Sequence, residues 1–171
     1  MTPSPMFQHL EKVPTTPLGK VQAFVDVLNA DKESRDWDAA LLSSHLRVIS
    51  ATESPRPAVT FRMTVTPELC NRVQNLHGGA TATIFDVVTS CAVSIVSQEG
   101  WWDYTGVSRT LNVVYLGAVP EGTEIDVSAE LMGIGKRQCS LRGVITRTED
   151  GTVMATAEHG KVHTPVGSSK M

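Results

Sequence analysis

The sequence lacks the features that mark several large classes of protein. It has no apolar run near the ~20 residues needed to span a bilayer. Its N-terminus, with prolines at positions 3, 5 and 14, lacks the apolar segment of a secretion signal. Because 15 Lys and Arg stand against 18 Asp and Glu, the net charge of −3 gives no general attraction to nucleic acid. We therefore expect no membrane span and no nucleic-acid partner.

Cysteine is also scarce. Cys70, Cys91 and Cys139 are odd in number and far apart, so no two of them stand at metal-ligand or redox spacing. We interpret them as reduced thiols of an intracellular protein. The last three residues, 169–171, read Ser-Lys-Met and differ by one apolar substitution from the peroxisomal signal Ser-Lys-Leu.

These two observations limit the expected location without fixing it. A cytoplasmic or a peroxisomal location fits them, and a mitochondrial one stays open. If the signal is used, Ser169, Lys170 and Met171 would bind a peroxisomal import receptor. Chance similarity is the alternative, because the signal is only three residues long.

A chain of 171 residues with 41% hydrophobic and 19% charged residues fits one soluble domain with a real core. Residues 1–41 are expected to form a loose arm and one amphipathic helix, since Val21, Phe24, Val25 and Leu28 recur at helical spacing after Pro17. The main domain should span residues 42–163, and residues 164–171 should form a flexible tail.

Alternating apolar and polar residues predict six strands in the main domain. They are expected over residues 42–50, 59–65, 106–116, 123–132, 138–148 and 152–162. Turn residues such as Asp150 and Gly151 separate them. Two strands, a long helix and four more strands make an α+β order, in which one antiparallel sheet must cover the helix.

The helix predicted over residues 78–98 is apolar on all sides, which is typical of a buried helix. Its one charged side chain is Asp86. A buried carboxylate without a partner is costly, so this residue requires an explanation. It could cap a loop or face solvent at the helix edge, or it could serve as a base or nucleophile in a partly dry cleft.

His77-Gly78-Gly79 stands where this helix begins. Two glycines let a ligand approach the backbone, and the free N–H groups of a helix N-terminus stabilise negative charge. The motif could also be a simple turn. Asp86 lies eight residues after Gly78, or ~12 Å along a helix. If both act on one carbonyl group, they must come from different subunits of a symmetric dimer with two equivalent sites.

Two segments resemble a known family. The run NRVQNLHGGATATIFD (residues 71–86) is similar to the signature of hotdog thioesterases of the phenylacetate-degradation type, and especially to the mammalian acyl-CoA thioesterases called thioesterase superfamily members. The run GVSRTLNVVYL (residues 106–116) resembles the strand that follows their helix. The resemblance covers about residues 42–163. It implies a hotdog fold, in which an antiparallel sheet wraps around a long central helix, here with an N-terminal helical extension.

The resemblance also implies a function and the residues that perform it. The chain would hydrolyse a fatty or aromatic acyl-CoA to the free acid and coenzyme A, as a homodimer or a dimer of dimers and without a cofactor. The Gly78 N–H would polarise the thioester carbonyl, helped by Asn71, while His77 shapes that half of the site. Asp86 of the other subunit would activate water or attack directly, and Ser108 would hold the water or the carboxylate.

Other positions are weaker candidates. Gly79, Arg109, Lys136 and Arg137 could contact the substrate, and Arg72 could receive a phosphate, although solvent-facing charges explain these basic residues equally well. The family often has Gly where this chain has Gln74, which puts the path of the Asn71 loop in doubt. Trp101 and Trp102 could line a pocket mouth or pack in the core.

His159 and His163 would lie ~13 Å apart on a strand, so they are not expected to share a metal. A hotdog dehydratase or hydratase also uses a histidine and an acid on acyl thioesters, but usually with a longer interval than the one from His77 to Asp86. A non-catalytic acyl-CoA binding module would have no need for Asp86 and Ser108.

Overall fold

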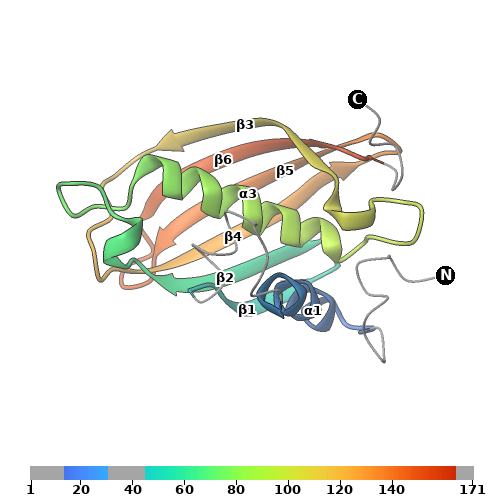
Figure 1. The fold of residues 1–171 in the computed structure, drawn as a ribbon, viewed down its shortest axis with the longest axis horizontal. Coiled ribbons are helices and arrows are strands. Elements are labelled where there is room, and N and C mark those ends of the chain that lie inside the picture. The colour runs from blue at the N-terminus through green and yellow to red at the C-terminus, as the bar shows by residue number, and fades with distance from the viewer. Residues whose placement is uncertain (1–13, 31–44, 165–171) are drawn as a thin grey trace.

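The computed structural model describes residues 14–30 and 45–164. Within them, an antiparallel sheet of six strands curls around a long helix, α3 (Gly78–Ser94), as Figure 1 shows. The strands are β1 (Arg47–Thr52), β2 (Ala58–Thr64), β3 (Val107–Tyr115), β4 (Glu124–Ile134), β5 (Gln138–Arg147) and β6 (Val153–Val162), in the spatial order β1-β2-β4-β5-β6-β3. The predicted α+β architecture is confirmed.

The element boundaries differ from the predicted ones by a few residues. The first strand begins at Arg47, and the part of its prediction over residues 42–44 lies outside the described residues. The long helix ends at Ser94 instead of residue 98, because Val96 N–H and Ser97 N–H both bond to the Val93 carbonyl and close a tighter turn. Two short 3-10 turns, η2 (Pro67–Leu69) and η3 (Asp103–Thr105), were not predicted.

The sheet buries one face against α3, as the alternation in its strands requires. On β4, for example, Ile125 and Val127 are fully buried. Gly143 on β5 sets how closely the helix approaches, because a Cβ there would lie 2.5 Å from Cδ1 of Phe85. The missing side chain lets the Phe85 ring reach the sheet, so the helix seats deeply in the curve of the strands.

One side of the molecule is less covered than the sequence suggested. The second half of α3 is buried, but Ala82, Asp86 and Val87 on its first half are only partly buried in the single chain. The prediction of a helix buried on all sides is therefore wrong for this face. The adjacent strand β3 pairs with β6 alone among the described strands, and Val114 and Tyr115 on it are 47% and 54% exposed.

The N-terminal extension is a helix, α1 (Pro17–Ala30), that packs beside β1 and the C-terminal half of α3 (Figure 1). Val21, Phe24 and Val25 are buried at this contact, and Lys20 Nζ donates to the carbonyl of Ile95 at 2.7 Å. None of the described helices combines the length and apolar character that crossing a membrane requires. The C-terminal Ser-Lys-Met of residues 169–171 lies outside the described residues.

Candidate active site

A polar cluster lies between the middle of α3 and the end of β6. On the helix, Asp86, Thr89 and Ser90 stand at i, i+3 and i+4 and therefore share one face. On the strand, His159 and Lys161 stand two residues apart and point to the same side of the sheet, toward that helix face. Two simple periodicities thus bring five polar side chains together.

Asp86 is the most accessible member of the cluster, with 42% of its side chain exposed. Its Oδ1 accepts a hydrogen bond from Ser108 Oγ at 2.5 Å and lies 3.3 Å from Nε2 of His159. The Ser108 backbone pairs with Lys161 on β6, which places its hydroxyl beside the helix. The hydrogen bond from Ser108 holds Oδ1 in place, and Oδ2 makes no hydrogen bond to any described residue.

His159 is almost fully buried, and its Nδ1 lies 2.6 Å from Thr89 Oγ1. Burial, and then the positive charge of Lys161, lowers the pKa of this imidazole to about 4, although Asp86 acts in the opposite direction. His159 is therefore neutral at neutral pH. Thr89 Oγ1 also donates to the Phe85 carbonyl at 2.6 Å, so its single proton serves that carbonyl or Nδ1 but not both. The other ring nitrogen, Nε2, lies 3.3 Å from Asp86 Oδ1 and makes no hydrogen bond to a described residue.

Neither His159 nor Lys161 was expected to take part in the reaction. Lys161 is 3% exposed, and its Nζ donates to Ser90 Oγ at 2.6 Å. A cavity of about 270 Å³ opens above both helix and strand, lined in part by Asp86, Ser108, Lys161 and Phe24. The inward positions of β6 run from apolar alanines to His159 and Lys161, and this change of character on one strand face was the signal available in the sequence.

The N-terminus of α3 has the arrangement that the His-Gly-Gly motif suggested. His77 is the N-cap, and its Nδ1 accepts the Gly79 N–H at 2.9 Å. The Gly79 amide is therefore occupied, whereas the Gly78 N–H donates to no described residue. Tyr115 Oη donates to the Gly78 carbonyl at 2.9 Å and ties the helix start to β3. The unused Gly78 amide thus stands at the positive end of the helix dipole.

The loop before this helix presents the side chain of Asn71. Its Oδ1 accepts the N–H groups of Val73 and Asn75 at 3.0 and 3.2 Å, so its amide NH₂ is the group left to act as a donor. Gln74 adopts a left-handed backbone conformation with φ +58°. The loop therefore makes, with a glutamine, a turn for which glycine is the ordinary choice.

The remaining candidates lie apart from Asp86. Arg109 falls in the irregular pairing between Ser108 and Thr110, and its side chain is exposed. Lys136 and Arg137 are exposed in the turn between β4 and β5, where the Arg137 carbonyl accepts the His163 N–H at 3.0 Å. Arg72 is exposed in the loop before α3.

The two tryptophans after α3 differ in their surroundings. Trp102 is fully buried and donates through Nε1 to the Gly135 carbonyl at 2.9 Å. Trp101 is partly buried and packs against the core. Of the two readings left open, core packing is therefore the one that holds for Trp102.

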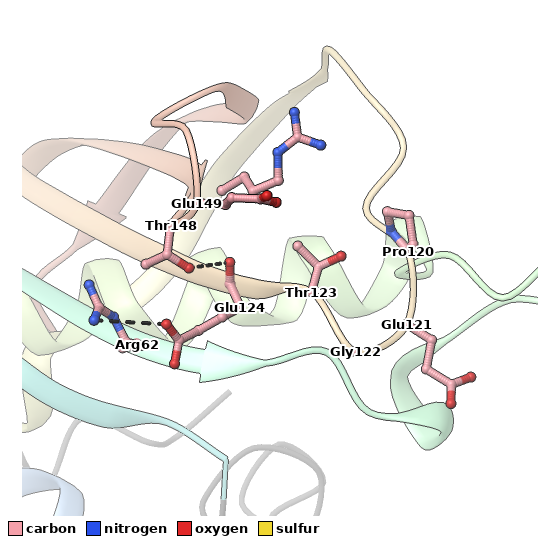
Figure 2. Close-up of a pocket in the computed structure, with 9 residues that line it drawn as sticks. Arg62, Pro120, Glu121, Gly122, Thr123, Glu124, Thr148 and Glu149 are labelled. Atoms are coloured by element: carbon pink, nitrogen blue, oxygen red, sulfur yellow. Dashed lines mark hydrogen bonds and ion pairs between the residues drawn. The ribbon is translucent and has the colours of Figure 1, made fainter.

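A larger depression of about 670 Å³ lies at one end of the sheet, between Arg62, the turn at residues 120–124 and the turn at residues 147–149 (Figure 2). We call it the Pro120 depression. Its cations are paired locally: Arg62 donates twice to Asp126, at 2.7 and 2.8 Å, and Arg147 bonds Asp150. Nothing in it resembles the buried, under-paired charges around Asp86. Among the described residues, no three His, Cys, Asp or Glu side chains form a group that could hold a metal.

Comparisons with known proteins agree with this geometry. Residues 74–154 match the family described as the thioesterase superfamily. The chain is 26% identical over 140 residues to human acyl-coenzyme A thioesterase 13, which covers 82% of this chain and 94% of that protein. The crystal structure of zebra fish thioesterase superfamily member 2 has a TM-score of 0.69 at 26% identity, over 83% of this chain and 96% of that one.

A more distant structure shares the fold alone. The E. coli PaaI protein of the phenylacetic acid degradation operon has a TM-score of 0.63 at 15% identity, over 85% of this chain and 95% of that one. The sheet order, the enclosed helix and the family match point the same way. Residues 74–154 match the thioesterase superfamily, and the chain has the hotdog fold, as the resemblance of its sequence implied.

Proposed function

We propose that the chain hydrolyses acyl-CoA thioesters in sites formed between two copies of itself. One copy supplies the Gly78 amide and the other supplies Asp86. The observation that carries the proposal is a carboxylate fixed by Ser108 on the open face of α3, in a chain whose relatives include acyl-coenzyme A thioesterases. A side chain held this firmly and yet left accessible suits a base or a nucleophile.

The arrangement accounts for each step of hydrolysis. Oδ2 of Asp86 takes a proton from a water molecule, whose oxygen forms the new bond to the thioester carbon. The carbon–sulfur bond then breaks, and the departing thiolate takes up a proton, so that acyl-CoA and water give the free acid and coenzyme A. Ser108 keeps Oδ1 occupied throughout, and the neutral ring of His159 lies beside the carboxylate, with its Nε2 3.3 Å from Oδ1.

The negative charge on the carbonyl oxygen needs donors from elsewhere. The Gly78 N–H and the Asn71 amide are unused donors near the start of α3. One well-aimed donor of this kind lowers the activation free energy by ~3 kcal/mol. Along one helix Gly78 and Asp86 are ~12 Å apart, too far to act on one carbonyl. A second copy in antiparallel contact brings the two ends together.

The open face described above supports such a dimer. The edge of β3 that no described strand pairs with offers backbone donors and acceptors. Val114 and Tyr115 on this strand are exposed, Tyr115 contacts Gly78 at the start of α3, and Ala82 and Val87 further along the helix are partly buried. A symmetric contact through this face would bury both apolar surfaces and join two sheets into one. We propose in addition that two such dimers associate into a tetramer, which sedimentation measurements would test.

The first experiment measures release of free thiol from a panel of acyl-CoAs of different chain length, with one aromatic member. We expect hydrolysis by the wild type and a loss of about 100-fold or more in Asp86→Asn, which keeps the side-chain shape and removes the base. Binding without hydrolysis would favour a ligand-binding module. Addition of water to a 2-enoyl-CoA would favour the hydratase.

The second experiment tests whether the site is shared. Gly78 is the first residue of α3, a position that tolerates proline, so Gly78→Pro removes the N–H and keeps the helix. Gly78→Ala, which keeps the N–H, is the matched control. We expect Gly78→Pro and Asp86→Asn chains to be inactive alone. Mixed dimers should regain one intact site, which amounts to about a quarter of wild-type activity in a random mixture.

If each chain held a complete site, mixing the two inactive variants would restore nothing. That result would contradict the shared site while leaving hydrolysis by the wild type in place. A single turnover in ¹⁸O-labelled water adds the chemical route, because a base mechanism puts the label only in the product acid. A covalent anhydride at Asp86 would instead leave label in the protein.

A further inference from the structure

Lys161 carries a buried ammonium group on the inner face of β6. Its Nζ donates one hydrogen bond to Ser90 Oγ at 2.6 Å. An ammonium group has three N–H donors and loses its hydration on burial, so it needs a negative charge nearby. Burial lowers the pKa of Lys161, which reflects that cost. The function proposed above assigns this residue no task.

The ionisable groups that face Lys161 come from three elements. Asp86 and Cys91 lie on α3, Cys139 on β5 and His159 on β6 itself. Burial raises the pKa of Cys91 to about 12 and that of Cys139 to about 11, so both thiols stay protonated at neutral pH. Neither thiol can therefore balance the charge of the ammonium group.

His159 does not balance it either, because the buried ring is neutral at neutral pH. The other elements around the cavity, α1, β3 and η3, contribute the uncharged Phe24, Ser108 and Thr105. Among the described residues, the Asp86 carboxylate is thus the anion that faces Lys161. The two charges are also linked through Ser90, whose Oγ accepts from Lys161 and donates to the Asp86 carbonyl at 2.6 Å.

We propose that Lys161 is a positioning residue that supplies the fixed positive charge of the active site and keeps the His159 ring neutral beside the Asp86 carboxylate. A nearby cation destabilises an imidazolium. The charge of Lys161 therefore widens the pH range in which the carboxylate lies beside an uncharged ring. Lys161 acts on the reaction only through these two groups, and its effect on turnover rests on the proposed function.

The first test needs no substrate. Lys161→Met removes the charge and keeps the length of the side chain, and replacing a buried charge by an apolar group often leaves stability unchanged or higher. The His159 ring is followed by NMR from pH 8 down to the pH at which each variant unfolds. We expect its pKa to rise by about one unit in Lys161→Met, since a like charge has been removed.

Lys20→Met is the matched control, because the Lys20 ammonium group donates to the carbonyl of Ile95, the C-cap residue of α3, but lies outside the cluster. It should leave the His159 titration unchanged. Lys161→Gln, which is neutral and polar, serves as the second uncharged variant and must give the same shift whether or not Lys161→Met folds. A His159 titration that is the same in wild type and in both neutral variants would overturn the proposal.

The second test uses thioester hydrolysis. The acidic limb of kcat/KM against pH should move upward by about one unit in Lys161→Met or Lys161→Gln, because the His159 ring beside the carboxylate would take up a proton at a higher pH. Lys161→Arg, which keeps the charge, should hold the wild-type limb. A purely structural lysine would change stability and leave the limb in place, which would contradict the proposal.

The two readouts separate the hypotheses. If the wild type hydrolyses no acyl-CoA, the proposed function fails, and the His159 titration still decides the electrostatic role of Lys161. If hydrolysis is found but neither the titration nor the acidic limb responds to loss of the charge, the positioning role fails and the proposed function stands.

Discussion

The cavity of about 270 Å³ beside Asp86, which we call the Asp86 cleft, and the Pro120 depression contain similar groups that differ in burial and pairing. Each has cations, carboxylates and a hydroxyl contact of 2.5 Å, from Ser108 to the Asp86 side chain in one and from Thr148 to the Glu124 carbonyl in the other. In the depression, each arginine has a carboxylate of its own at the surface. In the cleft, a buried histidine and a buried lysine face one carboxylate.

The difference shows why the smaller cavity is the better candidate for chemistry. Exposed pairs are screened by water and contribute little to stability or to the properties of their neighbours. Buried groups with too few partners shift one another's protonation, which is the condition that catalysis uses. Judged by composition and cavity size, the depression would be the candidate active site. Judged by the burial and pairing of its charged groups, the cleft is the better candidate.

The largest expected contrast comes from removing the two hydroxyl groups. Ser108→Ala should lower kcat/KM for acyl-CoA hydrolysis by about 100-fold, because it removes a charge-assisted hydrogen bond from the carboxylate. Thr148→Val in the depression should leave kcat/KM unchanged. Equal losses in both variants would mean that the 2.5 Å contact at Asp86 has no special role.

The two regions should also differ in how they make the folding stability depend on acid pH. The folded-state pKa of His159 is about 4, below the ordinary 6.5, so the unfolded chain binds the proton first as the pH falls. Stability should be constant above pH 6.5 and decline by roughly 2–3 kcal/mol between pH 6.5 and 4. Denaturant unfolding at several pH values should show this decline in the wild type and a much flatter profile in His159→Gln.

Asp150, which pairs with Arg147 of the depression, is the residue to compare with His159 in acid. Arg147 holds the pKa of this carboxyl below its ordinary 3.8, so the pair contributes stability that is lost only as the pH falls below about 3.8. Asp150→Asn should therefore keep the wild-type profile between pH 6.5 and 4. A decline that followed Asp150 instead of His159 would reverse the assignment.

A smaller effect is expected in the loop that joins the regions. Gln74 lies just before the start of α3, its carbonyl accepts the Glu121 N–H of the depression at 2.9 Å, and its φ is +58°. Gln74→Gly should raise the free energy of unfolding by about 0.5 kcal/mol, since relief of the left-handed strain slightly exceeds the added freedom of the unfolded chain. Gln138→Gly, in strand β5, should lower it.

The smallest effect should come from the surface pairs. Arg62→Met removes a bidentate contact to Asp126 that is partly open to solvent. We expect unchanged thioester hydrolysis and a slight loss of thermal stability that disappears in high salt, because exposed ion pairs are screened. A loss of activity would show that the depression takes part in function.

Much of the fold could be read from the sequence because its information was local. Strand alternation placed β2 and β4 to β6 within a few residues, and the apolar helix with its preceding His77-Gly78-Gly79 located α3. The C-terminal end of α3 was missed because turn geometry and hydrogen bonds after Val93 decide where the helix stops. The start of β1 was also missed by a few residues. The resemblance of two short segments supplied Asn71 and Ser108, which no local pattern would have selected.

The sequence by itself determined the order of the elements and the isolated acid on an apolar helix, since these follow from spacing along one strand or helix. Only the tertiary structure decided which groups surround that acid. His159 and Lys161 lie more than 70 residues from Asp86 and reach it because β6 crosses beneath α3. Their burial, and with it their protonation, depends on packing between distant segments, which no local periodicity encodes.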